Sequence, residues 1–246
     1  MFDPQSLIIL APASLFGALL GGLGAAAARG YSAKLVATLI AADSPPPTDQ
    51  PWQPPPMHAQ VQRNGSKDYS LSAFLGALGA VLLTLRFDLS AELALGTLLS
   101  LMLLMLALID QRHFLLPDNL TLPLLWTGLL CNVLGYFASL QDAVIGAVLG
   151  YACLWCIFWL FKLLRGKEGL GYGDFKLTAA LGAWLGWQAL PGIIFTAALA
   201  GACIGLLQVA RQKRRTQEPL PFGPFLAAAG FAALCIEGHQ LWPLNL

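Results

Sequence analysis

Residues 101–110 read Leu101-Met-Leu-Leu-Met-Leu-Ala-Leu-Ile-Asp110, an almost uninterrupted apolar run that ends in a carboxylate. Similar runs recur through the chain of 246 residues, of which 57% are hydrophobic and only 11% are charged. A typical soluble domain carries about 25% charged residues. A water-soluble enzyme and a disordered protein are therefore excluded, and lipid must be the solvent for most of the chain.

A membrane-spanning helix needs about 20 mainly apolar residues. Eight runs meet or approach this length, namely residues 6–28, 70–86, 91–110, 119–138, 142–162, 174–190, 191–210 and 221–237. The sixth and seventh are expected to be separated only by a tight break at Pro191-Gly192. The sequence thus predicts an all-α polytopic membrane protein with about eight transmembrane helices.

The basic residues predict the orientation of these helices. With the N-terminus placed outside, four alternate loops hold 13 of the 14 Lys and Arg residues, and only Arg86 falls on the other side. Because basic residues accumulate in cytoplasmic loops, both termini are predicted to lie outside. The start of the chain has Asp3 and no basic segment, so the first run is expected to be a retained helix rather than a cleaved signal peptide.

Four units are predicted along the chain: a first transmembrane helix over residues 1–28, a cytoplasmic Pro-rich loop over 29–69, a transmembrane core over 70–237 and an outer tail over 238–246. Seven Pro occur among the 13 residues from Ser44 to Pro56, which makes this stretch extended. It fits a spacer, with a Pro-motif ligand for a partner as the alternative.

Other site types are less favoured by the sequence. All five Cys lie in apolar runs, so Cys153 and Cys156 are interpreted as small packing residues, with a redox or zinc pair as the alternative. No Cys/His cluster has zinc spacing, and no metal is expected. A net charge of +1 argues against nucleic-acid binding.

Four acidic residues stand at predicted inner borders of the membrane: Asp110, Asp118, Glu168 and Asp174. Asp110 closes a long apolar run, where a charge is costly; an interfacial acid that simply ends a helix is the alternative. Asp118 follows Pro117, and either Asp118 or Asn119 is expected to be the N-cap of the next helix.

Asp174 follows three glycines, Gly169, Gly171 and Gly173, at a predicted junction between a loop and a helix. Glycines allow backbone conformations closed to other residues, and they let another chain approach closely. No strand precedes this stretch and no Gly-Lys-Ser/Thr follows it, so it is not a nucleotide-binding loop.

Charge counting places Asp110 and Asp174 on the same side of the membrane. Two carboxylates that converge there would repel by about 4 kcal/mol at ~4 Å and would share one proton. One carboxylate can then take a proton from water while its protonated neighbour polarises a peptide carbonyl. The pair therefore predicts aspartic peptide hydrolysis without a metal or a covalent intermediate.

At these residues the chain resembles the prepilin leader peptidases, which process type IV prepilins and type II secretion pseudopilins. One block is residues 109–126, with Asp110 and Pro117-Asp118, and another is residues 167–184, with Gly-Leu-Gly-Tyr-Gly-Asp174-Phe-Lys176. A third, Pro221-Phe-Gly-Pro224, is similar to the segment that enters the last helix of that family. The resemblance covers about residues 100–235.

The resemblance implies that Asp110 and Asp174 are the catalytic pair, without a cofactor for the peptidase. Gly171, Gly173, Asp118 and Glu168 would support them, and Lys176 would tune Asp174, orient the substrate or anchor the helix. The implied partners are the lipid bilayer and a prepilin or pseudopilin with a short basic leader. The implied location is the bacterial inner membrane, as a multi-pass protein with the site facing the cytoplasm.

Members of this family also methylate the new N-terminus with S-adenosylmethionine, an activity associated with their N-terminal region. Many carry two Cys-x-x-Cys pairs in the first loop, whereas this chain has no Cys before Cys131. Methylation is therefore a weaker expectation than cleavage. Two rival functions are a proton-coupled transporter, which would use membrane-border carboxylates to carry protons, and a non-catalytic homologue that acts in assembly.

Overall fold

The computed structural model describes residues 26, 30, 76, 78–79, 81–84, 87, 91–166, 171–211 and 220–237. The predicted first helix over 6–28, the Pro-rich loop over 44–56, Glu168 and the tail over 238–246 lie outside this part, apart from position 26. The described positions between 76 and 84 of the predicted second run are helical.

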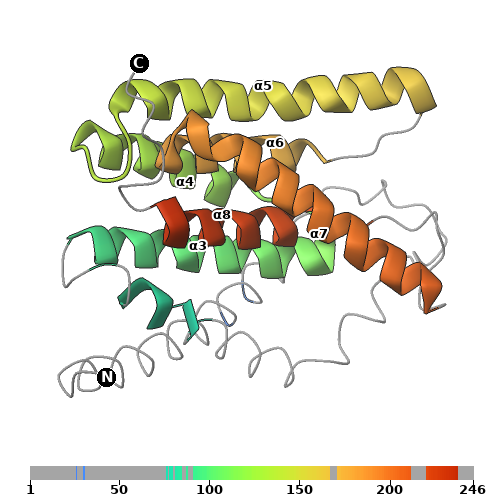
Figure 1. The fold of residues 1–246 in the computed structure, drawn as a ribbon, viewed down its shortest axis with the longest axis horizontal. Helices are drawn as coiled ribbons and strands as arrows, with labels where there is room; N and C mark the ends of the chain where they lie inside the picture. Colours follow the sequence, from blue (N-terminus) through green and yellow to red (C-terminus); the bar gives the residue numbers. More distant parts are fainter. Residues whose placement is uncertain are drawn as a thin grey trace, which may run out of the picture.

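Within these ranges the secondary structure is entirely helical (Figure 1). The elements are α3 (Ala91–His113), α4 (Asp118–Val133), α5 (Leu140–Arg165), α6 (Tyr172–Leu185), the 3-10 helix η2 (Trp187–Ala189), α7 (Leu190–Ala210) and α8 (Gly223–Glu237). A helix lies at each of the last six predicted runs, which confirms the all-helical class.

Two predicted helix boundaries differ from the structure. The break between the sixth and seventh runs lies at Gly186, whose φ of 83° ends α6, whereas Pro191 lies in the first turn of α7. The prediction at Pro191-Gly192 was wrong because a proline is tolerated in the first turn, where its missing N–H would have no helical partner. Helix α4 ends at Val133, earlier than predicted, and the chain then turns at Gly135 with a φ of 74°.

Among the described residues, three helical segments are long and apolar enough to cross a membrane: Ala91–His113, Leu140–Leu164 and Trp187–Ala210. Gly223–Ile236 is a shorter apolar helix. Large apolar side chains are exposed along α5 and α7, among them Leu160, Leu163, Phe195 and Leu206. Exposed apolar surface of this extent is typical of a membrane protein.

The cysteines of α5 belong to this exposed surface. Cys153 and Cys156 are exposed free thiols, whereas Cys131 of α4 is buried. Cys153 and Cys156 therefore lie on the face of α5 that points away from the protein core.

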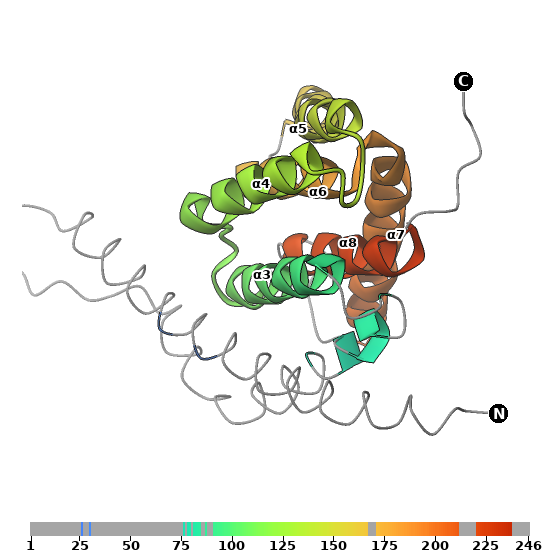
Figure 2. The ribbon, with the colours of Figure 1, turned by 90° about the vertical axis from the view of Figure 1, so that its left-hand side faces the viewer.

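Helix α6 lies at the centre of the described helices. It packs against α5 and α4 and also contacts α8, while α8 lies beside α3 and α7 (Figure 1, Figure 2). Ten of the 14 residues of α6 are buried, including Trp184. Gly146 of α5 and Gly182 of α6 meet backbone to backbone. Small residues allow such close packing of membrane helices.

A buried polar side chain fixes the end of α6 that lies away from Asp174. Asn132 of α4 is 2% exposed. It donates to the carbonyl oxygens of Ala183 (2.8 Å) and Trp184 (2.9 Å). Its Oδ1 accepts from the N–H groups of Phe137 (3.1 Å) and Ala138 (3.0 Å). All four hydrogen bonds that an amide side chain can make are formed, so this group is buried without an unpaired polar atom.

Candidate active site

Asp110 lies one turn before the end of α3 and is 5% exposed. Its Oδ2 accepts a hydrogen bond of 2.9 Å from the N–H of Gly223, the first residue of α8. A nearly buried carboxylate needs such a partner, since a buried charge without one is costly. Asp110 is therefore more than an interfacial acid that ends a helix.

Asp174 is the third residue of α6 and is 6% exposed. Its Oδ2 accepts from the N–H of Gly171 (3.1 Å), and its own N–H donates to the carbonyl oxygen of Gly171 (3.1 Å). The side chain thus satisfies an N–H group that the helix start leaves unpaired. The partial positive charge of the helix N-terminus also favours a carboxylate at this position.

The structure places Asp110 and Asp174 in the same region of the protein. The two carboxyl groups lie within range of direct electrostatic interaction. In the described part of the chain, each uses Oδ2 to accept a backbone N–H. The arrangement therefore has two nearly buried carboxyl groups within electrostatic range of each other, and a main-chain donor fixes each of them.

The glycine before Asp174 is explained by a close contact. A Cβ atom at Gly173 would lie 2.7 Å from the Cβ of Leu116, in the loop between α3 and α4. The segment that approaches Gly173 closely is thus a loop of the same chain. The predicted unusual backbone conformation is wrong for Gly171, which has an ordinary φ of −83° and ψ of 147°. Space rather than backbone freedom thus explains Gly173.

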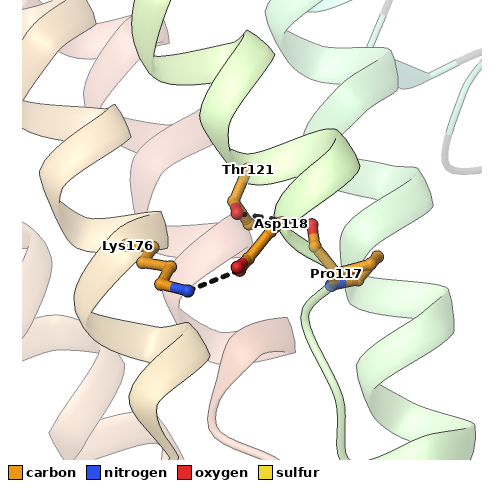
Figure 3. Close-up of polar contacts among 4 residues, drawn as sticks. All are labelled: Pro117, Asp118, Thr121 and Lys176. Carbon is orange, nitrogen blue, oxygen red and sulfur yellow. Dashed lines mark hydrogen bonds and ion pairs between the residues drawn. The ribbon is translucent and has the colours of Figure 1, made fainter.

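Asp118 and Lys176 form an ion pair beside this site, with 2.5 Å between Nζ and Oδ1 (Figure 3). The predicted N-cap role of Asp118 or Asn119 is wrong: Pro117 is the N-cap, and Asp118 is the first residue of α4. The carboxylate of Asp118 is drawn to Lys176 of α6 instead. The Oγ1 of Thr121 donates to the carbonyl oxygen of Pro117 (3.3 Å), on the first turn of α4.

One residue of the site was missed by sequence reasoning. Gly223 belongs to the block Pro221-Phe-Gly-Pro224, which was assigned only to the start of the last helix. A glycine between two prolines could have indicated this role. Proline has no N–H group, so few donors remain in the block, and glycine leaves space for a neighbouring side chain. Its contact with Asp110 joins residues 113 positions apart, which no local pattern reveals.

No group of three or more His, Cys, Asp or Glu side chains that could hold a metal ion occurs among the described residues.

These features define an all-helical membrane protein with a paired-aspartate site at one end of its helices. The chain belongs to the type IV leader peptidase family, whose profile matches residues 97–206. The resemblance drawn from the sequence is thereby confirmed. No solved structure shows a significant match to this chain.

Three relatives bear the name prepilin leader peptidase/N-methyltransferase. The protein of Burkholderia pseudomallei is 60% identical over 159 residues, which are 65% of this chain and 51% of the relative. That of Aeromonas hydrophila is 52% identical over 169 residues (69% and 58%). That of Pseudomonas aeruginosa is 45% identical over 201 residues (78% and 69%). The chain thus spans between 51% and 69% of the length of these relatives.

Proposed function

We propose that this chain is a membrane aspartic endopeptidase that cleaves the leader peptide of type IV prepilins or type II secretion pseudopilins. The observation that carries the proposal is the pair of nearly buried carboxyl groups, Asp110 and Asp174, each held by a backbone N–H. Family membership and the relatives named prepilin leader peptidase support the substrate class.

The proposed reaction uses the two carboxyl groups in opposite protonation states. The ionised one takes a proton from a water molecule, whose oxygen then bonds to the scissile carbonyl carbon. The protonated one donates its proton to the carbonyl oxygen. When the C–N bond breaks, the leaving nitrogen takes the proton that the first carboxylate gained from water. One hydroxyl group of the tetrahedral intermediate gives its proton to the other carboxylate, so the carboxyl pair returns to its starting state. The neighbouring charges favour one shared proton over two ionised carboxylates.

The proposed setting is the bacterial inner membrane, with eight transmembrane helices, both termini outside and the site facing the cytoplasm. The distribution of basic residues supports this orientation. Asp110 and Asp174 would then lie at the cytoplasmic surface, where a basic leader remains in water. The apolar segment of the substrate would enter the lipid beside α5 or α7, whose outer faces are apolar.

Methylation of the new N-terminus is a second, weaker part of the proposal, supported by the N-methyltransferase in the names of the relatives. Its methyl donor would be S-adenosylmethionine. On the proposed cytoplasmic side, the described aspartates are Asp110, Asp118 and Asp174; two form the pair, and Asp118 binds Lys176. These side chains are thus engaged in other contacts, and the N-terminal region associated with methylation lies almost entirely outside the described residues.

The test of the peptidase proposal is cleavage of a purified prepilin by the full chain in lipid nanodiscs. Asp110→Asn and Asp174→Asn are each expected to abolish cleavage while the protein inserts and accumulates normally. Glu92→Gln is the matched control, because Glu92 lies in the first turn of α3, at the opposite end from Asp110. Normal cleavage by either Asn variant would show that the pair is not catalytic.

A further inference from the structure

The start of α8 contacts the candidate catalytic pair directly. Gly223 is buried, and its N–H lies 2.9 Å from Oδ2 of Asp110. Helices α3 and α8 lie side by side and run in opposite directions, so the last turn of one meets the first residue of the other (Figure 1).

The N–H of Gly223 has no role inside its own helix. The first N–H groups of a helix lack intrahelical partners, and helical bonding begins with Phe225 and Leu226, which both donate to the carbonyl oxygen of Phe222 at 3.1 Å. Pro221 and Pro224 carry no N–H. Asp110 therefore supplies the partner of a donor that the helix leaves unpaired.

Only glycine fits this contact. A Cβ atom at position 223 would lie 2.7 Å from Oδ2 of Asp110 and 3.0 Å from its Cγ. Any other residue would push the carboxyl group away from the N–H that holds it. Position 223 therefore needs a residue that has an N–H group and no side chain. Both requirements come from the same atom, Oδ2 of Asp110.

We infer that Gly223 is a positioning residue of the peptidase, which holds Oδ2 of Asp110 so that Oδ1 meets the reacting water. This inference rests on the proposed function. A backbone donor at a helix N-terminus also stabilises a carboxylate through the positive end of the helix dipole. The start of α8 therefore sets both the place and the charge of one member of the pair.

The sharpest test replaces Gly223 with glycolic acid by cell-free synthesis of the full chain into nanodiscs. The resulting ester lacks the N–H and adds no side chain. A hydrogen bond to a charged group contributes about 1.5–3 kcal/mol, so kcat for prepilin cleavage should fall about 10- to 100-fold. KM should change less than about twofold, because a positioning residue does not bind the substrate.

Three further substitutions separate positioning from stability. Gly223→Ala, which adds the Cβ atom, should lower kcat at least as much as the ester. Lactic acid in place of Ala232 also puts an ester in α8, about 13 Å further along, and should leave kcat near normal. Gly201→Ala should be tolerated, because its Cβ atom would meet Phe225 at an ordinary 3.4 Å.

Hydrogen exchange at the Gly223 amide gives a readout that does not depend on activity. The amide should be protected in the wild type, exposed in Asp110→Ala and still protected in Asp174→Ala. A normal kcat in the glycolic acid variant, or an unprotected Gly223 amide in the wild type, overturns the inference and leaves the proposed function standing. Absence of cleavage by the wild type would overturn the proposed function itself.

Discussion

The ammonium group of Lys176 binds the carboxylate of Asp118 across the gap between two helix starts. Asp118 is the first residue of α4, which follows Asp110 after a short loop, and Lys176 lies one half-turn beyond Asp174 on α6. The Asp118 side chain is 54% exposed and that of Lys176 is 30% exposed. Since exposed ion pairs contribute about 0–1 kcal/mol, its main effect must be on geometry.

Asp118→Asn is expected to lower the rate of prepilin cleavage about three- to tenfold and to leave the unfolding temperature nearly unchanged. Without the ion pair, the first turn of α6 loses one constraint on the position of Asp174. The double exchange Asp118→Lys with Lys176→Asp should restore part of the rate. Initial rates and thermal unfolding in nanodiscs measure both effects, and complete inactivation by Asp118→Asn would instead place Asp118 among the reacting groups.

The two glycines next to Asp174 are expected to differ in their tolerance of alanine. Gly173→Ala puts a Cβ atom 2.7 Å from the Cβ of Leu116, whereas Gly171→Ala meets nothing closer than 3.5 Å. Cleavage should fall more than tenfold for the first and change little for the second, since α6 or the loop must move in the first case alone.

Two variants of Leu116 test whether its Cβ atom causes the loss of cleavage in Gly173→Ala. Leu116→Ala keeps the Cβ atom and should not rescue Gly173→Ala, whereas Leu116→Gly removes that atom and should restore part of the cleavage rate. Equal loss of activity at Gly171 and Gly173 would contradict the steric explanation.

Asn132→Ala is expected to lower the free energy of unfolding by at least about 2 kcal/mol, because it removes hydrogen bonds to two buried carbonyl oxygens and two half-buried N–H groups. Denaturant titration of the purified protein measures this loss. Thr127→Ala is the matched control on α4, since Thr127 donates only within its own helix. If both variants unfold alike, the four hydrogen bonds of Asn132 do not stabilise the fold.

Trp187→Phe is expected to leave cleavage unchanged while lowering the unfolding temperature slightly. The Nε1 of Trp187 donates to Oδ1 of Asp142 (2.9 Å), and Oγ of Ser139 donates to Oδ2 (2.7 Å). This exposed cluster ties η2 to the start of α5, at the opposite end of α5 from the candidate site. A reduced cleavage rate with an unchanged unfolding temperature would show that this end also influences the site.

The sequence predicted the helices because apolar runs of nearly 20 residues leave few alternatives in lipid. Charge counting assigned Asp110 and Asp174 to the same side of the membrane, and the two carboxyl groups lie within electrostatic range of each other. The residues that cap the helix starts were harder to predict. The N-cap at Pro117 depends on a distant partner, since Lys176 takes the carboxylate that could have capped the helix.

The roles of Gly223 and Asn132 could not be predicted from the sequence. Each acts through contacts with residues far along the chain: Gly223 with Asp110, and Asn132 with Ala183 and Trp184. A lone asparagine in an apolar run and a glycine between prolines look like local features. Their roles appear only when the helices are packed together.

Helix α6 is only 14 residues long, so it rises about 21 Å, well short of the roughly 30 Å thickness of the hydrocarbon layer. A lipid-facing helix of this length would create a hydrophobic mismatch. Because its neighbours rather than lipid surround α6, no such mismatch arises at its ends. Asp174, in the first turn of α6, is therefore enclosed by neighbouring helices and kept out of contact with lipid.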